Sequence, residues 1–377
     1  MENVMIGPIT FTYEELLKKR EAGVSEKLLE TLKTKADGIL HSPVANVTMR
    51  TLRAPSGDPK DYMSLGTYWW PNPNTPDGLP YVRRDGEGNP AISQPVGIGT
   101  PFGRTFNLAL AAFYLGDPDK KYSDYANRQL RAWFIDEETR MNPNARYAQA
   151  IPGICDGRGI GLIDFAQAYR LFDGMGILEC MGLLPEDTLK GVRAWYNEFL
   201  DWMLTHEQGY EANIAANNHG TWFDAHVLSA AVALNRTTLA KKICDTSYDL
   251  RTKRQIAPDG SQAHELARTI PLTYSCFNLE AFFVIANIAD RLGYKRYWSA
   301  DEEIGEPILK RAIDFLLPFI KDPDSCPYPQ IKKNKSDIRF SRELLRLDAR
   351  CPGNGYKEIA YSFGNLEDDL ETLLPLK

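Results

Sequence analysis

Apolar side chains recur three and four positions apart along much of this chain, which is the spacing of one face of an α-helix. The clearest segments are residues 106–115, 159–172, 189–204, 222–234, 277–292 and 308–320. Strand-like alternation is scarce. Helices of this length separated by loops favour an all-α protein made of helical hairpins. The pattern alone leaves a bundle, a solenoid and a closed α/α toroid open.

The long segment 68–101 has no clear periodicity and is rich in Pro and Gly. Such a segment in a compact domain is typical of a lid or a binding loop. We therefore expect a substrate-covering loop at about residues 64–101, with Tyr68, Trp69 and Arg83 in contact with a ligand. Aromatic rings stack on sugars, and Arg binds carboxylates through two parallel hydrogen bonds. The alternative is that Trp69 and Trp70 pack the loop onto the body of the protein.

Composition narrows the class of protein. The chain has 377 residues without a linker or a break in composition, which predicts a single domain over residues 1–377. The net charge of −6 argues against a general nucleic-acid binder, although a cleft is able to be locally basic. No apolar run reaches the roughly 18 residues of a membrane span, and no signal peptide is visible. Six scattered cysteines without a CxxC pair fit buried free thiols better than disulfides.

Two short segments bring together an amide, an imidazole, a guanidinium and a phenol. The four residues are Asn218, His219, Arg268 and Tyr274. The amide and the guanidinium are able to neutralise a carboxylate, while the imidazole and the phenol are able to move protons. These are the groups needed to remove a proton next to a carboxylate. Pro271 lies between Arg268 and Tyr274 and should break the helix there, which would let both side chains reach one site.

Each of these residues also has a plainer interpretation. Asn217 and Asn218 stand where the helix through residue 222 should begin, so one of them is a candidate N-cap. A histidine is more often structural than catalytic. His226 lies two helical turns after His219 and either orients it or fills the core. His264 is the first residue of the second segment, and the sequence leaves open whether it contacts the substrate.

These segments resemble motifs of the alginate lyase family of polysaccharide lyases. The resemblance rests on an Asn-Asn-His motif at 217–219 and a Glu-Leu-x-Arg motif at 265–268 followed by Tyr274. It is extended by the Tyr-Trp-Trp-Pro segment at 68–71 and by the segments 147–153 and 157–159. The resemblance implies an α/α toroid with a cleft at one end, acting in the periplasm or secreted. It implies an anionic uronic acid polysaccharide as partner, with no nucleic acid, no membrane, no cofactor and no metal.

The implied reaction is β-elimination, in which the proton at C5 is removed and the O4 glycosidic oxygen leaves. Asn218 and Arg268 would neutralise the carboxylate, and His219 and Tyr274 would transfer protons. The expected substrate-binding residues are Tyr68, Trp69, Arg83, Gln149, Asn217, Trp222 and His264. In mannuronate and glucuronate the proton and O4 leave from the same side of the ring, so Tyr274 alone would suffice. In guluronate the proton lies on the opposite side, and His219 would remove it.

Other motifs fit less well. Residues 264–268 begin like a zinc-binding HExxH helix, but the fifth position is Arg268, and residues 157–161 lack a full phosphate-loop pattern. One alternative is an α/α-barrel glycoside hydrolase acting on uronate oligosaccharides, which needs two carboxylates. Its candidates are Asp156, Asp164, Asp224, Asp259 and Glu265, and no spacing selects a pair. The other alternative is a non-catalytic glycan-binding protein that keeps only the aromatic platform at 68–70.

Overall fold

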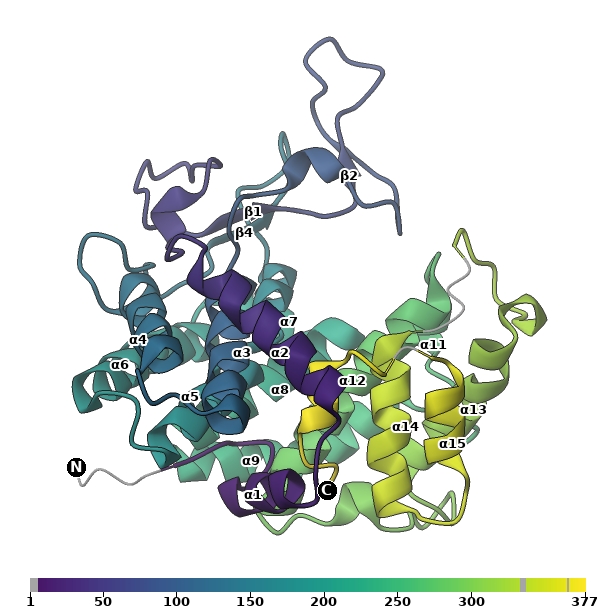
Figure 1. The fold of residues 1–377 in the computed structure, drawn as a ribbon. Helices are drawn as coiled ribbons and strands as arrows, with labels where there is room; N and C mark the ends of the chain where they lie inside the picture. The colour runs from purple at the N-terminus through teal and green to yellow at the C-terminus, as the bar shows by residue number, and fades with distance from the viewer. Residues whose placement is uncertain (1–5, 333–336, 365) are drawn as a thin grey trace. The chain divides into compact units, whose positions relative to one another are not determined.

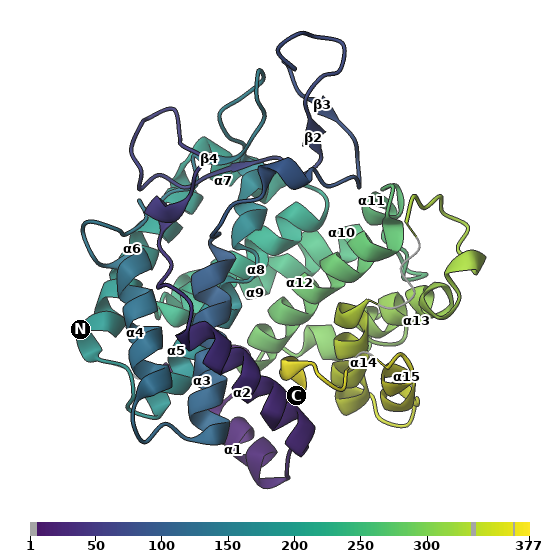
Figure 2. The same ribbon diagram turned by 45° about the horizontal axis from the view of Figure 1, so that its top comes forward.

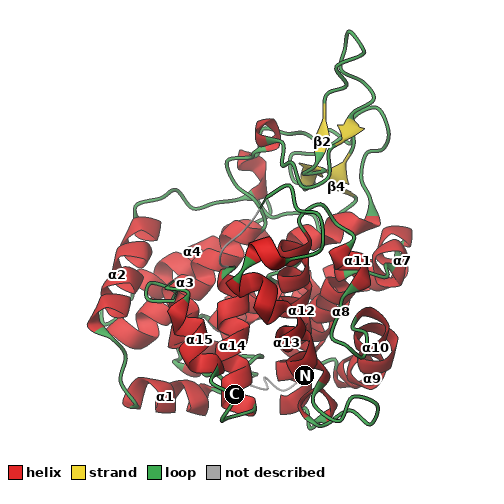
Figure 3. Ribbon diagram, turned by 90° about the vertical axis from the view of Figure 1, so that its right-hand side faces the viewer, coloured by secondary structure: helices red, strands yellow, loops and turns green. Residues whose placement is uncertain are grey.

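The computed structural model describes residues 6–332, 337–364 and 366–377, and most of these are helical (Figures 1 and 3). The chain forms two compact units. The first unit comprises residues 1–8, 34–215 and 232–235, and the second comprises residues 9–33, 216–231 and 236–377. The single-domain prediction for residues 1–377 is not tested by this division and stays a prediction.

The first unit is built around helices that pack on one another. Its helices are α3 (Gly99–Leu115), α4 (Lys121–Phe134), α5 (Ala168–Cys180), α6 (Glu186–Thr205) and α7 (Glu207–Ile214). Helix α3 packs on both α4 and α5, and α4 packs on α6, as the ribbon shows (Figure 1). Gly174 lets α5 approach α3 closely, because a Cβ there would lie 2.8 Å from the Cα of Phe106.

The strands of the first unit are short and form two small sheets. β1 (Met63–Leu65) pairs in parallel with β4 (Tyr147–Ala150), and β2 (Trp69–Trp70) pairs antiparallel with β3 (Val82–Arg83). The loop between β2 and β3 extends away from the helices of this unit (Figure 2). The expectation of an irregular segment over 68–101 was therefore wrong in part. The segment contains a hairpin, the 3₁₀ turn η2 (Pro90–Ile92) and the start of α3.

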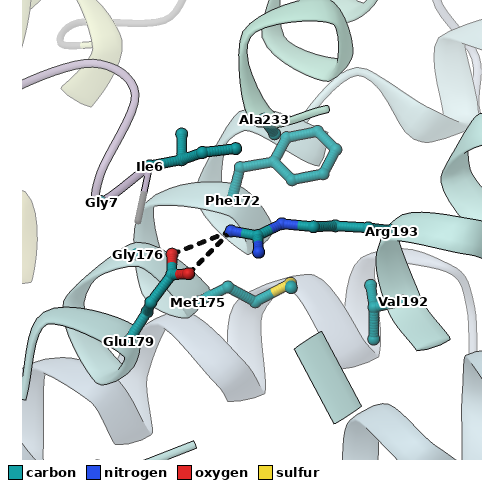
Figure 4. Close-up of a pocket in the computed structure, with 9 residues that line it drawn as sticks. All are labelled: Ile6, Gly7, Phe172, Met175, Gly176, Glu179, Val192, Arg193 and Ala233. Carbon is teal, nitrogen blue, oxygen red and sulfur yellow. Dashed lines mark hydrogen bonds and ion pairs between the residues drawn. The ribbon is translucent and has the colours of Figure 1, made fainter. Parts of the chain in front are cut away.

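Gly7 and Pro8 of the first unit pack against α5. Gly176 makes this possible, because a Cβ there would lie 2.1 Å from the carbonyl carbon of Gly7. Beside this contact, Arg193 of α6 donates to both carboxylate oxygens of Glu179 at 2.9 Å (Figure 4). The cavity next to the pair measures only about 10 Å³ and has room for at most one water molecule. It is therefore a packing defect of the helix pair and not a ligand site.

The second unit is entirely helical in the residues that the structure describes. Its main helices are α1 (Tyr13–Glu21), α8 (Asn218–Ala233), α9 (Thr237–Ser247), α10 (Lys253–Gln255), α11 (Ala263–Leu266), α12 (Pro271–Arg291), α13 (Ile308–Lys321), α14 (Ile338–Arg350) and α15 (Tyr356–Ser362). The last two residues of α8 belong to the first unit. A π-helical turn, η4 (Tyr248–Thr252), joins α9 to α10. Further 3₁₀ turns of the two units are η1 (Val47–Met49), η5 (Arg296–Trp298), η6 (Pro323–Ser325) and η7 (Leu370–Leu373). Helix α2 (Glu26–Leu40) begins in the second unit and ends in the first.

Helix α12 forms the centre of the second unit and packs against α11, α13 and α14. By length and hydropathy it is the one helix in the described part of the chain that could cross a membrane, but 83% of that stretch is buried inside the protein. This burial identifies it as a core helix. All six cysteines are free thiols, as the sequence favoured.

The predicted helices are present, with one correction. The periodicity at 106–115, 189–204, 222–234, 277–292 and 308–320 corresponds to α3, α6, α8, α12 and α13. The predicted helix at 159–172 is instead the 3₁₀ turn η3 (Gly159–Phe165) followed by α5. Gly159 and Gly161 lower helix propensity there, and Gly159 donates its N–H to Glu211 at 2.6 Å instead of a helical carbonyl.

We predict that Gly174→Ala destabilises the protein, because the new methyl group would meet the backbone of Phe106 and force the helices apart. The expected loss is about 1–3 kcal/mol, the usual cost of overpacking a core. Gly103→Ala on α3 is the matched control, since nothing lies within 4 Å of its Cβ position. That change should be neutral or stabilising, because Ala favours helix over Gly. Equal melting temperatures for the two variants would contradict the close packing of α3 and α5.

Candidate active site

The candidate catalytic residues belong to the second unit, and the first of them stand at the start of α8. The Asn217 side chain accepts a hydrogen bond from the His219 N–H at 3.2 Å, and the Asn217 carbonyl accepts from Gly220 at 2.9 Å. Asn217 is thus the N-cap of α8, as one of the sequence interpretations proposed. This leaves the Asn218 side chain for another role.

Asn218 is held by Glu265 through two hydrogen bonds. The Asn218 backbone N–H donates to Oε1 at 2.8 Å, and its Nδ2 donates to Oε2 at 2.7 Å. Both residues are 1% exposed. Burial raises the pKa of Glu265, while the two Asn218 donors and the nearby Arg268 charge oppose that shift. The contact fixes the plane of the Asn218 amide and leaves its second Nδ2 proton without a partner among the described residues.

Arg268 and Tyr274 lie against each other, although six residues separate them. Helix α11 ends at Leu266, α12 begins at Pro271, and the chain between them is not helical. The break predicted at Pro271 is therefore present. It brings the Arg268 guanidinium carbon to 3.6 Å from the centre of the Tyr274 ring. A cation on the face of an aromatic ring is favourable, so this pair holds the phenol and the guanidinium in one place.

A buried network of neutral amides joins the start of α8 to α12. Gln255 is at its centre, since its Oε1 accepts from Thr221 at 2.9 Å and from Asn278 at 3.0 Å. The Gln255 Nε2 donates to the Asn217 carbonyl at 3.3 Å, and Asn278 also donates to Gln262 at 2.9 Å. Buried hydrogen bonds of this kind favour one geometry of the groups that they join. The segment that carries Asn218 and His219 is thereby fixed to the helix that carries Tyr274.

Three other predicted residues of this unit lie in different surroundings. Trp222 is 1% exposed, and its ring packs against Phe277 at 5.1 Å. This burial gives no support to a contact between Trp222 and a substrate. His226 is 2% exposed, which favours its interpretation as a core residue, whereas His264 on α11 is exposed.

The remaining predicted binding residues belong to the first unit. Trp69 and Arg83 are paired across the β2–β3 hairpin, and Tyr68 directly precedes it. Arg83 is exposed and forms an ion pair with Asp85 at 2.7 Å. Gln149 lies on β4 with a backbone φ of 50°, and its amide Nε2 donates to Asp164 at 3.0 Å. The hairpin and β4 therefore keep these side chains on ordered backbone, not on a loose loop.

The sequence did not indicate the roles of Glu265, Gln255, Gln262 and Asn278. Glu265 appeared only as part of the Glu-Leu-x-Arg motif and as one of five carboxylates considered for hydrolysis. Two others of those five are engaged elsewhere, since Asp224 pairs with Arg251 at 3.0 Å and Asp164 accepts from Ser64. The spacing of Glu265 to Arg268 was the available signal, but spacing does not show which partner a carboxylate binds. Within the described ranges, no group of three or more His, Cys, Asp or Glu residues could hold a metal ion.

The chain is similar to known alginate lyases. The chain matches the Alginate lyase family over residues 46–326. An alginate lyase from Bacteroides ovatus is 34% identical, with 98% of this chain and 99% of that chain covered and a TM-score of 0.90. Alginate lyase A1-III from Sphingomonas species A1 is 17% identical, with coverages of 94% and 92% and a TM-score of 0.58. A variant of alginate lyase A1-III in complex with a tetrasaccharide is 16% identical, with coverages of 94% and 92% and a TM-score of 0.60. The two A1-III structures show similarity of fold alone. The comparison with curated proteins gives no match.

The chain belongs to the alginate lyase family. The predictions of an all-α protein of the α/α toroid class and of a polysaccharide lyase are thereby confirmed. Nothing favours the glycoside hydrolase or the non-catalytic glycan-binding protein. The roles of individual site residues stay predictions.

We predict that Glu265→Gln weakens both stability and turnover. Gln offers one acceptor where Glu offers two, so one buried Asn218 donor loses its partner, at a cost of about 1–3 kcal/mol. The melting temperature and kcat should both fall. The exposed Glu302, in the same unit, provides the control Glu302→Gln, which should change neither. A Glu265→Gln variant with unchanged kcat would show that Asn218 does not need this contact.

We also predict that His226 makes the protein sensitive to acid. Burial lowers its pKa from 6.5 to about 3. Because the unfolded chain then binds a proton before the folded one does, stability should be lost as the pH falls from about 6.5 towards 3. In His226→Gln the melting temperature should fall less steeply over that window. His41→Gln, at an exposed position, should follow the wild-type slope, and identical slopes for all three proteins would refute the assignment.

Proposed function

We propose that this protein cleaves alginate by β-elimination and leaves a C4–C5 double bond at the new non-reducing end. The observation that carries the proposal is the stacking of Arg268 on Tyr274 at 3.6 Å. In the same unit, Glu265 fixes Asn218 and interacts with the charge of Arg268. These contacts place a cation, a phenol and an amide donor in one unit. The solved relative from Bacteroides ovatus is described as an alginate lyase, which supports the same reaction.

The first step of the proposed reaction neutralises the uronate carboxylate. The ionised carboxylate resists further negative charge at C5, and fixed donors reduce that resistance. Arg268 supplies a full positive charge, and Asn218 supplies the Nδ2 proton that Glu265 does not use. Because the Asn218 amide is already oriented, little reorganisation is needed when charge develops.

The second step moves the protons. Tyr274 removes the C5 proton, the C5–H electron pair forms the C4–C5 double bond, and the C4–O4 bond breaks. The leaving O4 oxygen then takes up a proton from Tyr274. Tyr274 acts as a phenolate when it removes the C5 proton and is a neutral phenol until it protonates O4. The Arg268 cation on the ring stabilises the negative charge that Tyr274 carries before the first transfer and after the second. For guluronate, whose proton lies on the opposite side, His219 removes the proton and Tyr274 only donates.

The finer points of the proposal concern substrate and place. Mannuronate, guluronate and glucuronate polymers are all within this chemistry. Tyr68, Trp69, Arg83, Gln149, Asn217 and His264 are the proposed substrate-binding residues. Action in the periplasm or outside the cell is proposed on the family resemblance alone. Recovery of the activity only in the cytoplasmic fraction of native cells would refute it.

The test is ultraviolet absorbance of the unsaturated product on polymannuronate, polyguluronate, mixed alginate and glucuronan. Tyr274→Phe should abolish cleavage of every polymer that the wild type cleaves. Tyr210→Phe is the matched control, because Tyr210 is 66% exposed on α7. His219→Ala should reduce guluronate cleavage most, since only that geometry needs a base on the opposite side.

Two outcomes would contradict the proposal. Release of reducing ends without absorbance would point to hydrolysis. Substantial activity of Tyr274→Phe on any polymer would remove Tyr274 from the proton transfer, and a pH profile of kcat/KM would then identify the remaining acid or base.

A further inference from the structure

The Gly157-Arg158-Gly159-Ile160-Gly161 segment has a structural purpose in the first unit that its phosphate-loop appearance does not explain. A Cβ at Gly157 would lie 1.9 Å from the Arg146 carbonyl oxygen. A Cβ at Gly161 would lie 2.5 Å from the Ala148 carbonyl oxygen. Glycine is therefore needed for the segment to lie against β4. Two hydrogen bonds complete the contact, from Arg158 N–H to Ala148 at 3.0 Å and from Gly161 N–H to the Arg158 carbonyl at 2.9 Å. The backbone of Arg158 is thus fixed.

The Arg158 side chain is fixed as well. Its Nε donates to the Gln149 carbonyl at 2.9 Å, and its Nη2 donates to Gln149 Oε1 at 3.2 Å. Gln149 is itself held with φ at 50°, because its N–H donates to Ser64 at 2.8 Å and its Nε2 donates to Asp164 at 3.0 Å. A left-handed backbone at a non-glycine residue is unfavourable and is kept where surrounding contacts determine it.

Trp69 and Gly66 complete the surroundings of the guanidinium. The guanidinium carbon of Arg158 lies 6.0 Å from the centre of the Trp69 ring. A Cβ at Gly66 would lie 2.9 Å from Arg158 Nη2 and 2.6 Å from Trp69 Cδ1, so glycine leaves the space that these two side chains occupy. The result is an oriented guanidinium beside an aromatic ring that is itself only half buried.

Within the ranges that the structure describes, no Asp or Glu forms an ion pair with Arg158. The acidic groups nearest in charge are already engaged, since Asp164 accepts from Tyr62, Ser64 and Gln149, and Glu211 accepts from Gly159. Burial lowers the pKa of Arg158 and the charge of Arg83 acts in the same direction, while Cys155, Glu211 and Asp164 oppose that shift. A partly buried cation without a directly paired carboxylate is unfavourable, and an anionic ligand in contact with it would relieve that cost.

We propose that Arg158, aligned by Gln149 and next to Trp69, binds a carboxylate of the polyuronate on a sugar residue that does not react. The inference rests on the proposed function, because Asn218 and Arg268 serve the carboxylate beside the breaking bond there. The Arg158 guanidinium offers its unused N–H groups to both oxygens of a carboxylate, and the Trp69 ring offers a face to the sugar. Arg158 is thus a specificity residue that selects charged over neutral sugars at its position.

Kinetics distinguish this role from a purely structural one. Arg158→Gln should raise KM about tenfold or more with little change in kcat, the signature of lost uniform binding. Arg158→Lys keeps the charge but loses the pair of parallel N–H groups, so its KM should lie between those of the wild type and Arg158→Gln. Arg128→Gln is the matched control for charge, because Arg128 is an exposed residue of α4 in the same unit, and its KM should be unchanged. A fall in kcat with KM unchanged would overturn the proposal.

A binding measurement separates this inference from the proposed reaction. Titration calorimetry in the Tyr274→Phe background would use a saturated mannuronate tetramer and the same tetramer with its carboxyl groups reduced to alcohols. Adding Arg158→Gln should weaken binding of the charged tetramer about tenfold and leave the reduced one unchanged. Equal losses for both tetramers, or no loss for either, would refute the role of Arg158. If the wild type makes no unsaturated product on any polyuronate, the proposed function fails, while the two titrations still decide whether Arg158 binds a carboxylate. Should Arg158→Gln not fold, Arg158→Lys answers the same question.

Discussion

The two hydrogen bonds between Asn218 and Glu265 are the constraint on which the rest of the candidate site depends. They join the first residue of α8 to α11, a helix of one turn, and α11 leads through a short non-helical segment to the start of α12. Without that contact, the Asn218 amide would lose the partner that orients it. The amide network around Gln255 adds a second link between α8 and α12. The first link holds Asn218, and the second holds the carbonyl of the preceding residue, Asn217. Positioning in this unit thus comes from buried polar groups, and the apolar core supplies the stability.

Much of the fold could be predicted because it follows from local rules. Apolar spacing identified most of the long helices, and Asn217 occupies the cap position that its side chain favours. The break expected at Pro271 is also present, since α12 begins there. The failures have a common cause in tertiary contacts. Gly159 and Gly161 lie in a segment with helical periodicity, yet their close approach to other backbone atoms selects a 3₁₀ turn. The hairpin at Trp69 and Arg83 was missed because two-residue strands carry too few positions to show alternation.

The candidate site shows the same division between composition and arrangement. The sequence supplied the chemical groups, since an amide, an imidazole, a guanidinium and a phenol within about fifty residues are informative by composition. It did not supply their partners. Glu265 was visible as an acidic residue, but its two bonds to Asn218 depend on the fold. Trp222 was expected to bind substrate, and the structure packs its ring against Phe277 in the core.

The amide network has a consequence for the medium in which such an enzyme works. Gln255, Gln262, Asn278 and Thr221 carry no charge and do not titrate, so neither protonation nor dissolved ions weaken the bonds among them. A polyuronate brings a dense cloud of counter-ions wherever it binds, and ordinary surface ion pairs are screened under such conditions. A scaffold of neutral groups keeps the spacing of α8 and α12 the same in dilute buffer and in a concentrated ionic gel. The charged groups then respond to the polymer, while the neutral network that fixes α8 and α12 stays unchanged.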